Sequence, residues 1–429
     1  MSSPEKKARA AAQTHGSGAR IAPYITGVGA FLPNAPVDND GIEPILGPLG
    51  GTPSRIKKRI LRNNGIRTRH YAVEPGTGRA THTNARMTAE AIRALARGTG
   101  LDLASLDLLA CGTSTPDQWI PGHGPMVHGE LGCPPCEVIS TAGVCAAGMT
   151  ALKYACASVA SGYSRTSIAT GSELASSLLR AQHFDTKGAS RGAHPEDAAH
   201  GAKDPEVNPL VAFEQEFLRW MLSDGAGAVL VEPEPRADGL SLRVDWIEVV
   251  SLANILEPCM YWGARKKEDG SLVGWREAGS VSDAMRAGLF NLTQDIKLLG
   301  KEISVRLVNG IFPKIRAKHG LAPGELTWFL PHYSSEVFRQ ELYNRFLEID
   351  FPIPFEAWFT NLAEKGNTGS ASIFIILEEL MRSNRIAPGD TILCFVPESA
   401  RFSAAYAHLT AVGPPAAPGT PDGPGRTSG

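Results

Sequence analysis

Short apolar runs alternate with helix-patterned segments along almost the whole of this 429-residue chain. The strand-like runs are "YITGVGAFLP" (24–33), "LDLLACGTST" (106–115), "TSIATGSE" (166–173), "GAGAVLVEP" (225–233), "LTWFLPH" (326–332) and "DTILCFVP" (390–397). Between them, apolar residues recur at helical spacing, as in residues 87–95 and again in residues 146–161. This alternation predicts an α/β fold, and the nearly continuous hydrophobicity of the runs favours largely parallel, buried sheets.

Composition predicts two halves between two polar tails. Residues 1–19 are polar and Ala-rich, and residues 413–429 are mostly Pro and Gly. We expect both tails to be disordered, because they cannot bury enough apolar surface to order themselves. The proline-rich stretch "EPEPRADGL" predicts a boundary between an N-terminal half, 20–235, and a C-terminal half, 236–412. A polar insertion at 185–208 is expected to be a surface loop.

Charge and apolar content exclude several classes of protein. A formal net charge of -2 argues against a protein whose main partner is nucleic acid, which would carry a basic excess. No apolar run approaches the roughly 18 residues that a membrane helix needs, and the first residues lack the apolar core of a signal peptide. Seven irregularly spaced cysteines suit reduced thiols better than a disulfide framework. We therefore expect a cytoplasmic globular protein.

Cys145 lies among small residues in "STAGVCAAGM", after a strand-like run and before a helix. At a helix N-terminus, free N–H groups and the helix dipole stabilise a thiolate and lower its pKa. The same N–H groups can stabilise an oxyanion when the sulfur attacks a carbonyl. The small neighbours would then admit a bulky thioester to the sulfur. The alternative is a buried cysteine that acts only as a small hydrophobic side chain.

Two polar residues follow other apolar segments. His332 comes just after the strand-like run at 326–332, and Asn367 stands in the glycine-flanked turn "GNTG" before a helix. Taken singly, they are a surface histidine and a helix cap. A cysteine, a histidine and an asparagine at three strand-to-helix junctions together indicate an acyl-transfer site.

Seven segments carry a more specific resemblance. They are "NGIRTRHYA" (64–72), "GTSTPDQWIPGHGPMVHGELG" (112–132), "STAGVCAAGMTALKYA" (140–155), "ATGSE" (169–173), "LSDGAGAVLV" (222–231), "PHYSSEVF" (331–338) and "GNTGSASI" (366–373). In this order and spacing they resemble the β-ketoacyl-acyl-carrier-protein synthase III group of thiolase-fold condensing enzymes.

That resemblance implies a five-layered α-β-α-β-α fold of two similar halves, normally a homodimer, acting on acyl thioesters of carrier protein or coenzyme A. It implies that Cys145 is the acylated nucleophile and that His332 and Asn367 hold the oxygen of an enolate. It implies no cofactor and no metal.

Departures from the family pattern point to one branch. The glycine-rich loop near the C-terminus of the family is "VPESARF" here, and we expect an oxyanion-binding N–H near Ala400 together with that of Cys145. With "ATGSELAS" and the insertion at 185–208, these features most resemble the ketosynthases of dialkylresorcinol and cyclohexanedione biosynthesis. That branch implies joining two β-ketoacyl units and then closing a ring, for which Glu173 is the candidate base. The alternative for Glu173 is a carboxylate that caps a loop or pairs with an arginine.

The basic run "RIKKRILRNNGIRTR" suggests how substrate is delivered. Arg59 and Asn63 stand where relatives that use coenzyme A have tryptophan and arginine, which favours a carrier-protein substrate. The residues expected to contact carrier protein or coenzyme A are Arg55, Lys57, Lys58, Arg59 and Arg62. A solvated helix face is the alternative interpretation.

Other interpretations stay open at this point. Cys133 and Cys136 have CxxC spacing, but no second pair or histidine cluster completes a zinc site, so chance spacing or a dimer-loop role is favoured over metal. Besides the resorcinol branch, the chain fits a malonyl-condensing synthase of fatty acid or polyketide biosynthesis. It also fits a catalytically silent subunit that only shapes a heterodimer.

Overall fold

The computed structural model describes residues 21–49, 54, 57–184 and 216–414. The expected N-terminal tail, the insertion at 185–208 and all but two residues of the expected C-terminal tail lie outside the described residues. Within the described residues, no helix combines the length and apolar content needed to cross a membrane.

Fifteen strands and a larger set of helical segments make up the described chain. The strands are β1 (Tyr24–Phe31), β2 (Val37–Asp38), β3 (Thr68–Arg69), β4 (Leu108–Thr113), β5 (Glu137–Ala142), β6 (Ser167–Glu173), β7 (Gly225–Glu232), β8 (Ser241–Ser251), β9 (Met260–Tyr261), β10 (Ala264–Lys266), β11 (Leu272–Gly274), β12 (Thr293–Gln294), β13 (Trp328–Pro331), β14 (Thr391–Glu398) and β15 (Ser403–Val412). The α-helices are α2 (Ile42–Leu46), α3 (Lys57–Asn64), α4 (Asn84–Thr99), α5 (His123–Leu131), α6 (Ala147–Ala160), α7 (Ser176–Leu179), α10 (Val281–Arg286), α11 (Ile296–Ser304), α12 (Phe312–His319), α13 (Val337–Glu348), α14 (Leu362–Lys365) and α15 (Ser372–Arg382). A π-helical segment, η7 (Val305–Ile311), joins α11 to α12, and the short 3-10 turns are η2 (Leu103–Ser105), η3 (Ala181–His183), η6 (Trp275–Glu277), η8 (Phe355–Ala357) and η9 (Gly369–Ala371).

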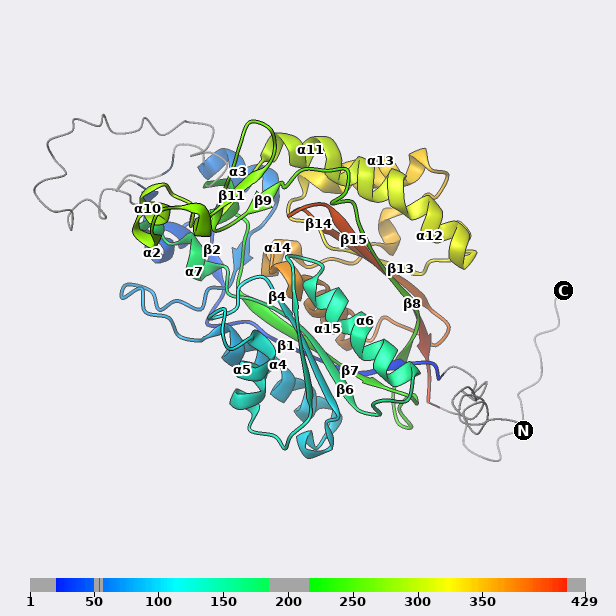
Figure 1. Cartoon of the computed structure of the whole chain (residues 1–429). Helices are drawn as coiled ribbons and strands as arrows, with labels where there is room; N and C mark the ends of the chain where they lie inside the picture. Colours follow the sequence, from blue (N-terminus) through cyan, green and yellow to red (C-terminus); the bar gives the residue numbers. More distant parts are fainter. Residues whose placement is uncertain (1–20, 50–53, 55–56, 185–215, 415–429) are drawn as a thin grey trace, which may run out of the picture.

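One nine-stranded sheet extends through the molecule in the order β13-β14-β15-β8-β1-β7-β6-β4-β5 (Figure 1). The strands β13 and β14 are parallel, and β4 is parallel to both β5 and β6. The other five neighbouring pairs are antiparallel. The expectation of an α/β fold is confirmed, whereas the expectation of a largely parallel sheet is wrong.

The error has a physical reason. The sequence analysis missed β8 and β15, which pair with each other and lie in the antiparallel central part of the sheet. The strand β15 follows β14 through a tight hairpin at 399–402, and such a short connection can only join antiparallel strands. Continuous hydrophobicity does not by itself indicate parallel pairing, because it only requires that both faces of a strand be covered.

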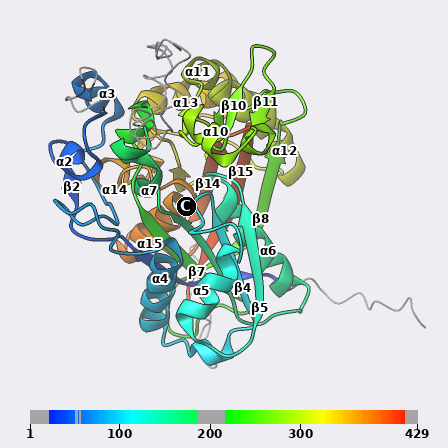
Figure 2. The same ribbon diagram turned by 60° about the vertical axis from the view of Figure 1, so that its left-hand side comes forward.

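Helices cover both faces of this sheet. The residues of β7 alternate between two cores: Ala226, Ala228 and Leu230 pack with α4, while Val229 and Val231 share a core with α6 and α15. On the α4 side, α5 packs next to α4 and against β4 and β5 (Figure 2). The sheet therefore separates α4 and α5 from the pair formed by α6 and α15.

Glycines allow α6 and β6 to approach the segment that follows Asn367. A Cβ atom at Gly148 in α6 would lie 2.6 Å from Cε2 of Phe374 and 2.7 Å from the carbonyl oxygen of Ser370. A Cβ atom at Gly171 in β6 would lie only 2.2 Å from the same carbonyl oxygen. Part of the small-residue pattern around Cys145 is therefore explained by close packing rather than by access to the sulfur.

Candidate active site

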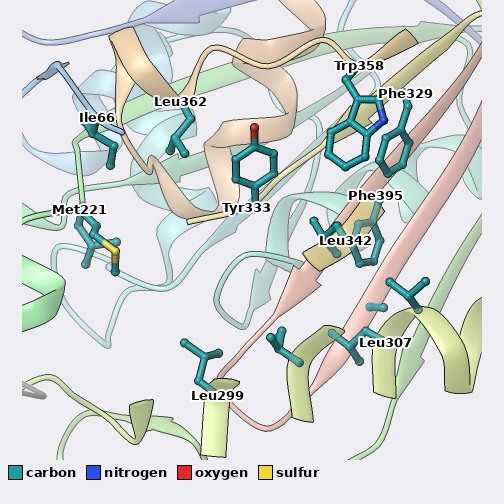
Figure 3. Close-up of a cluster of buried hydrophobic side chains, with 14 of the residues drawn as sticks. Ile66, Met221, Leu299, Leu307, Phe329, Tyr333, Leu342, Trp358, Leu362 and Phe395 are labelled. Carbon is teal, nitrogen blue, oxygen red and sulfur yellow. The ribbon is translucent and has the colours of Figure 1, made fainter. Parts of the chain in front are cut away.

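An apolar cavity of about 350 Å³ brings the main predicted site residues together. Cys145, Glu173, His332 and Asn367 all line it, and their exposed fractions are 8%, 3%, 3% and 5%. Much of the remaining wall is apolar; Figure 3 shows the contributions of Met221, Leu299, Tyr333, Leu342 and Phe395. The structure thus gathers four side chains from distant parts of the sequence around one space that suits an acyl chain.

His332 directly follows β13, and its position is fixed by the neighbouring strand. Its backbone N–H donates to the carbonyl oxygen of Phe395 in β14 at 2.8 Å. Burial lowers the pKa of the His332 imidazole to about 4. The ring is therefore neutral near pH 7, with one nitrogen that can donate a hydrogen bond.

Asn367 is held by three hydrogen bonds to backbone groups. Its own N–H donates to the Met221 carbonyl at 3.0 Å, and the Ser223 N–H donates to the Asn367 carbonyl at 2.8 Å. The side-chain Oδ1 accepts the N–H of Gly369 at 2.9 Å. Because Oδ1 is engaged in this way, the Nδ2 amide group is left as the donor that Asn367 can offer to a ligand.

The expectation of a lowered pKa at Cys145 is wrong. Burial raises the pKa of this thiol well above its ordinary value, and the nearby Glu398 and Glu173 carboxyl groups raise it further. The N–H groups of Val144 and Ala146 both donate to Oε2 of Glu398 at 3.0 Å. The α6 N-terminus was expected to favour the thiolate, but a carboxylate already occupies these flanking donors.

Glu398 is the site residue that the sequence analysis missed. It is the last residue of β14, and it reaches across to the backbone on both sides of Cys145. The signal was present in "VPESARF", which replaces the family's glycine-rich loop, whereas the expectation there concerned a backbone N–H near Ala400. The informative change was the acidic residue Glu398 in a segment that is glycine-rich in the family.

Glu173 ends β6 and lies at the base of the cavity wall. Its carboxyl group accepts from the Ser114 N–H at 3.1 Å, the Ser114 hydroxyl at 2.7 Å and the Thr115 hydroxyl at 2.7 Å. It also accepts the Ser370 N–H at 3.4 Å. Burial raises the pKa of Glu173 despite these hydrogen bonds, which oppose the change. Glu173 therefore both caps a loop, as the alternative interpretation held, and faces the cavity.

The structure does not bring Ala400 into the cavity wall. The hairpin residues that line the cavity are Pro397 and Ser399. The Ala400 carbonyl instead accepts the N–H groups of Cys259 at 2.7 Å and Met260 at 3.2 Å. An oxyanion-binding N–H from this hairpin remains a prediction.

The basic residues lie apart from the cavity, on α3. Lys57 forms an ion pair with Glu43 at 3.1 Å and its Nζ lies 5.6 Å from the centre of the Trp220 ring. Lys58, Arg59 and Arg62 are exposed or partly exposed, and Arg55 lies outside the described residues. Lys57 is thus paired within the fold, whereas Lys58, Arg59 and Arg62 are exposed.

Comparison with known proteins shows what the chain resembles. The profile of the family described as "3-Oxoacyl-[acyl-carrier-protein (ACP)] synthase III C terminal" matches residues 317–396, which include His332 and Asn367. Over 380 residues the chain is 24% identical to the β-ketoacyl-[acyl-carrier-protein] synthase III of Caulobacter vibrioides, covering 86% of this chain and 94% of that protein. The chain is a synthase III-like condensing acyltransferase.

Solved structures show the same fold. The tetronic acid condensing enzyme AbyA1 superposes with a TM-score of 0.68 at 20% identity, covering 90% of this enzyme and 99% of that chain. OleA of Xanthomonas campestris, solved as a cysteine-to-serine variant with bound lauric acid and lauroyl-CoA, gives a TM-score of 0.65 at 18% identity, covering 91% and 99%. The synthase III-like enzyme thus has the α/β thiolase-type fold that the resemblance implied.

Replacing Glu398 tests whether its carboxylate raises the pKa of Cys145. In Glu398→Gln the negative charge beside Cys145 is lost, so we expect the Cys145 pKa to fall. An adjacent charge typically changes a pKa by about 1 to 3, so iodoacetamide should alkylate Cys145 about tenfold faster or more at neutral pH. The rate measured against pH separates a changed pKa from changed access.

Glu325→Gln is the matched control for this experiment. The Glu325 carboxylate also accepts a backbone N–H, that of Ala322 at 2.8 Å, but it does not line the cavity. Alkylation of Cys145 in Glu398→Gln at the unmodified rate and with the same pH profile would contradict the assignment.

Proposed function

We propose that this enzyme joins two β-ketoacyl thioesters on Cys145 and then closes a ring, giving a cyclohexanedione or dialkylresorcinol precursor. The observation that carries the proposal is the shared cavity of Cys145, His332, Asn367 and Glu173. A nucleophile, two neutral hydrogen-bond donors and a buried carboxyl group are the parts that two successive carbon–carbon bond formations require.

The first step loads an acyl group. The sulfur of Cys145 attacks the carbonyl carbon of an acyl thioester, and the carrier thiol departs with the proton that Cys145 gives up. The developing oxyanion would be held by the Cys145 N–H and by an N–H of the hairpin near Ala400. The acyl chain would extend along the apolar side chains that line the cavity, among them Met221, Leu299 and Leu342, which are labelled in Figure 3.

The second step makes the first carbon–carbon bond. A second β-ketoacyl thioester loses a proton to a water molecule from the carbon between its two carbonyl groups and becomes an enolate; the Cys145 thiolate that leaves in the next step takes up a proton in its place. The N–H of neutral His332 and the Nδ2 amide of Asn367 would both donate to the enolate oxygen, which stabilises charge that develops only in the transition state. The enolate carbon then attacks the acyl group and expels the Cys145 thiolate.

Ring closure needs another proton to leave a carbon next to a carbonyl. Glu173 is the proposed base, because burial raises its pKa and so makes its carboxylate a stronger proton acceptor. Four hydrogen bonds orient the carboxyl group at the cavity wall. The carbanion formed in this way attacks the thioester carbonyl carbon of the same chain, the carbon–sulfur bond breaks, and the carrier thiol leaves with the proton that Glu173 had taken up.

Several features support the proposed substrates and assembly. AbyA1 is named for tetronic acid, which is a cyclic compound, and the OleA structure holds a lauroyl chain on coenzyme A. The cations Lys58, Arg59 and Arg62 offer a surface to an acidic carrier protein. We further propose a homodimer of chains with two similar halves, 20–235 and 236–412, in five layers.

A second candidate is a starter synthase that condenses an acyl-cysteine with malonyl carrier protein. The name of the Caulobacter relative favours it. In that reaction carbon dioxide leaves in place of the proton, so the second thioester needs no base. His332 and Asn367 would have the same task, while Glu173 would have none beyond capping its loop.

The products formed from defined thioesters distinguish the two candidates. We expect two β-ketoacyl thioesters to give a cyclised dione without malonate, detected by mass spectrometry of the extracted products. The control is the same enzyme given one acyl thioester and one malonyl thioester. A linear β-ketoacyl product that forms only with malonate, and no cyclic product under either condition, would exclude the ring-forming proposal.

Glu173→Gln tests the second deprotonation. We expect this variant to be acylated at Cys145 at least as fast as the unmodified enzyme, because a carboxyl group that raises the Cys145 pKa is lost, but to lose the cyclic product by about 100-fold or more, as for a general base. The readout is the ratio of cyclic to uncyclised condensation product, which a merely structural role would leave unchanged. Unchanged cyclisation, or an equal loss of both products, would remove the role assigned to Glu173.

A further inference from the structure

His128, Cys133 and Cys136 form a cluster that the condensation chemistry does not use. One potential ligand atom from each residue lies within 4.8 Å of the other two, and all three side chains are half-buried. The sequence alone showed no histidine cluster beside this CxxC pair and predicted no metal. The fold adds one histidine to the pair, because His128 stands five residues before Cys133 and the chain returns to it.

The local backbone explains how the three residues meet. His128 lies in the last turn of α5, and the N–H of Gly132 closes that turn on the His128 carbonyl at 3.1 Å. Gly132 has φ +65, a left-handed conformation that reverses the chain directly after the helix. Cys133 begins the returning segment, and Cys136 immediately precedes β5.

The imidazole of His128 is already oriented. Its Nε2 lies 3.1 Å from the carbonyl oxygen of Pro134, which suits an Nε2–H donor and leaves a lone pair on Nδ1. Histidines that bind metals usually donate their other ring N–H to a carbonyl or carboxylate in this way. The hydrogen bond therefore selects a tautomer that can bind a metal ion.

We propose that His128, Cys133 and Cys136 bind one Zn²⁺ ion that fastens the end of α5 to the start of β5. Thiolate and imidazole ligands favour zinc over magnesium or calcium, which prefer oxygen. The two cysteines supply their sulfur atoms as thiolates, so binding releases two protons to solvent. Among the described residues no fourth side chain joins the cluster, which leaves the fourth position of a tetrahedral site to a water molecule.

The ion would be structural rather than catalytic. Cys136 precedes β5 and Cys145 follows it, so the two residues lie at opposite ends of a six-residue strand. Such a strand is about 20 Å long. At that separation the ion does not touch the reacting atoms, and it would act by fixing α5 against β4 and β5 (Figure 2).

Zinc content of the full chain tests the proposal directly. Protein purified in metal-free buffer with a thiol-free reductant and then given ZnCl₂ alone should retain about one zinc per chain after gel filtration, measured by elemental analysis. His128→Asn and Cys136→Ser should each lose that zinc. Two variants outside the cluster, His183→Asn and Cys156→Ser, serve as matched controls and should keep it.

Cobalt gives a second readout that does not depend on the variants. Co²⁺ bound by two thiolates should add a sulfur-to-metal charge-transfer band in the near ultraviolet for the unmodified chain, and Zn²⁺ should displace that band. Substoichiometric zinc in the unmodified chain, or equal zinc in the cluster variants and the controls, would overturn the proposal. So would a Cys133–Cys136 disulfide that persists under reductant. None of these outcomes bears on the condensation chemistry.

Discussion

The close approach of α6 and β6 to the segment after Asn367 is the constraint on which the site depends. It is possible because Gly148 and Gly171 have no side chain where the Ser370 carbonyl passes. Cys145 and Asn367 are more than 200 positions apart in the sequence, and this contact holds both of them at one cavity. A methyl group at either glycine would collide with backbone, which cannot move aside as a flexible side chain can.

Around that contact, burial disfavours the charged forms of the His332 imidazole and the Cys145 thiol. Burial holds His332 neutral and raises the pKa of Cys145, and two carboxyl groups lie near the sulfur. Such a site would stabilise an enolate through neutral hydrogen-bond donors, which lose less solvation on burial than ions do. The raised pKa also keeps the Cys145 side chain a thiol near neutral pH. Glu398 contributes to the raised pKa of Cys145, because it accepts the N–H groups of Val144 and Ala146 that would otherwise favour the thiolate.

Much of this arrangement could be predicted from the sequence. Strands such as β4 and β14 contain apolar runs, and Cys145, His332 and Asn367 follow strands or precede helices as the motifs indicated. What could not be predicted depends on contacts between distant segments. The rise in the Cys145 pKa depends in part on Glu398. Glu398 accepts a hydrogen bond from Ala146, the neighbour of Cys145, and these two partners are 252 positions apart in the sequence. The strands β8 and β15 were missed because they mix polar, small and apolar residues.

The central claim is that Cys145 carries the acyl group because it alone among the buried cysteines of the described chain opens onto the cavity. Cys111, Cys156 and Cys394 are as buried, and burial raises each of their pKa values to about 12, but none of them lines that space. The most direct measurement is peptide mapping by mass spectrometry after incubation with an isotopically labelled acyl thioester. We predict one label, on the peptide that contains Cys145, with His332→Ala and Asn367→Ala still labelled there. An unlabelled Cys145, or label spread over the other cysteines, would contradict the account and favour a catalytically silent subunit.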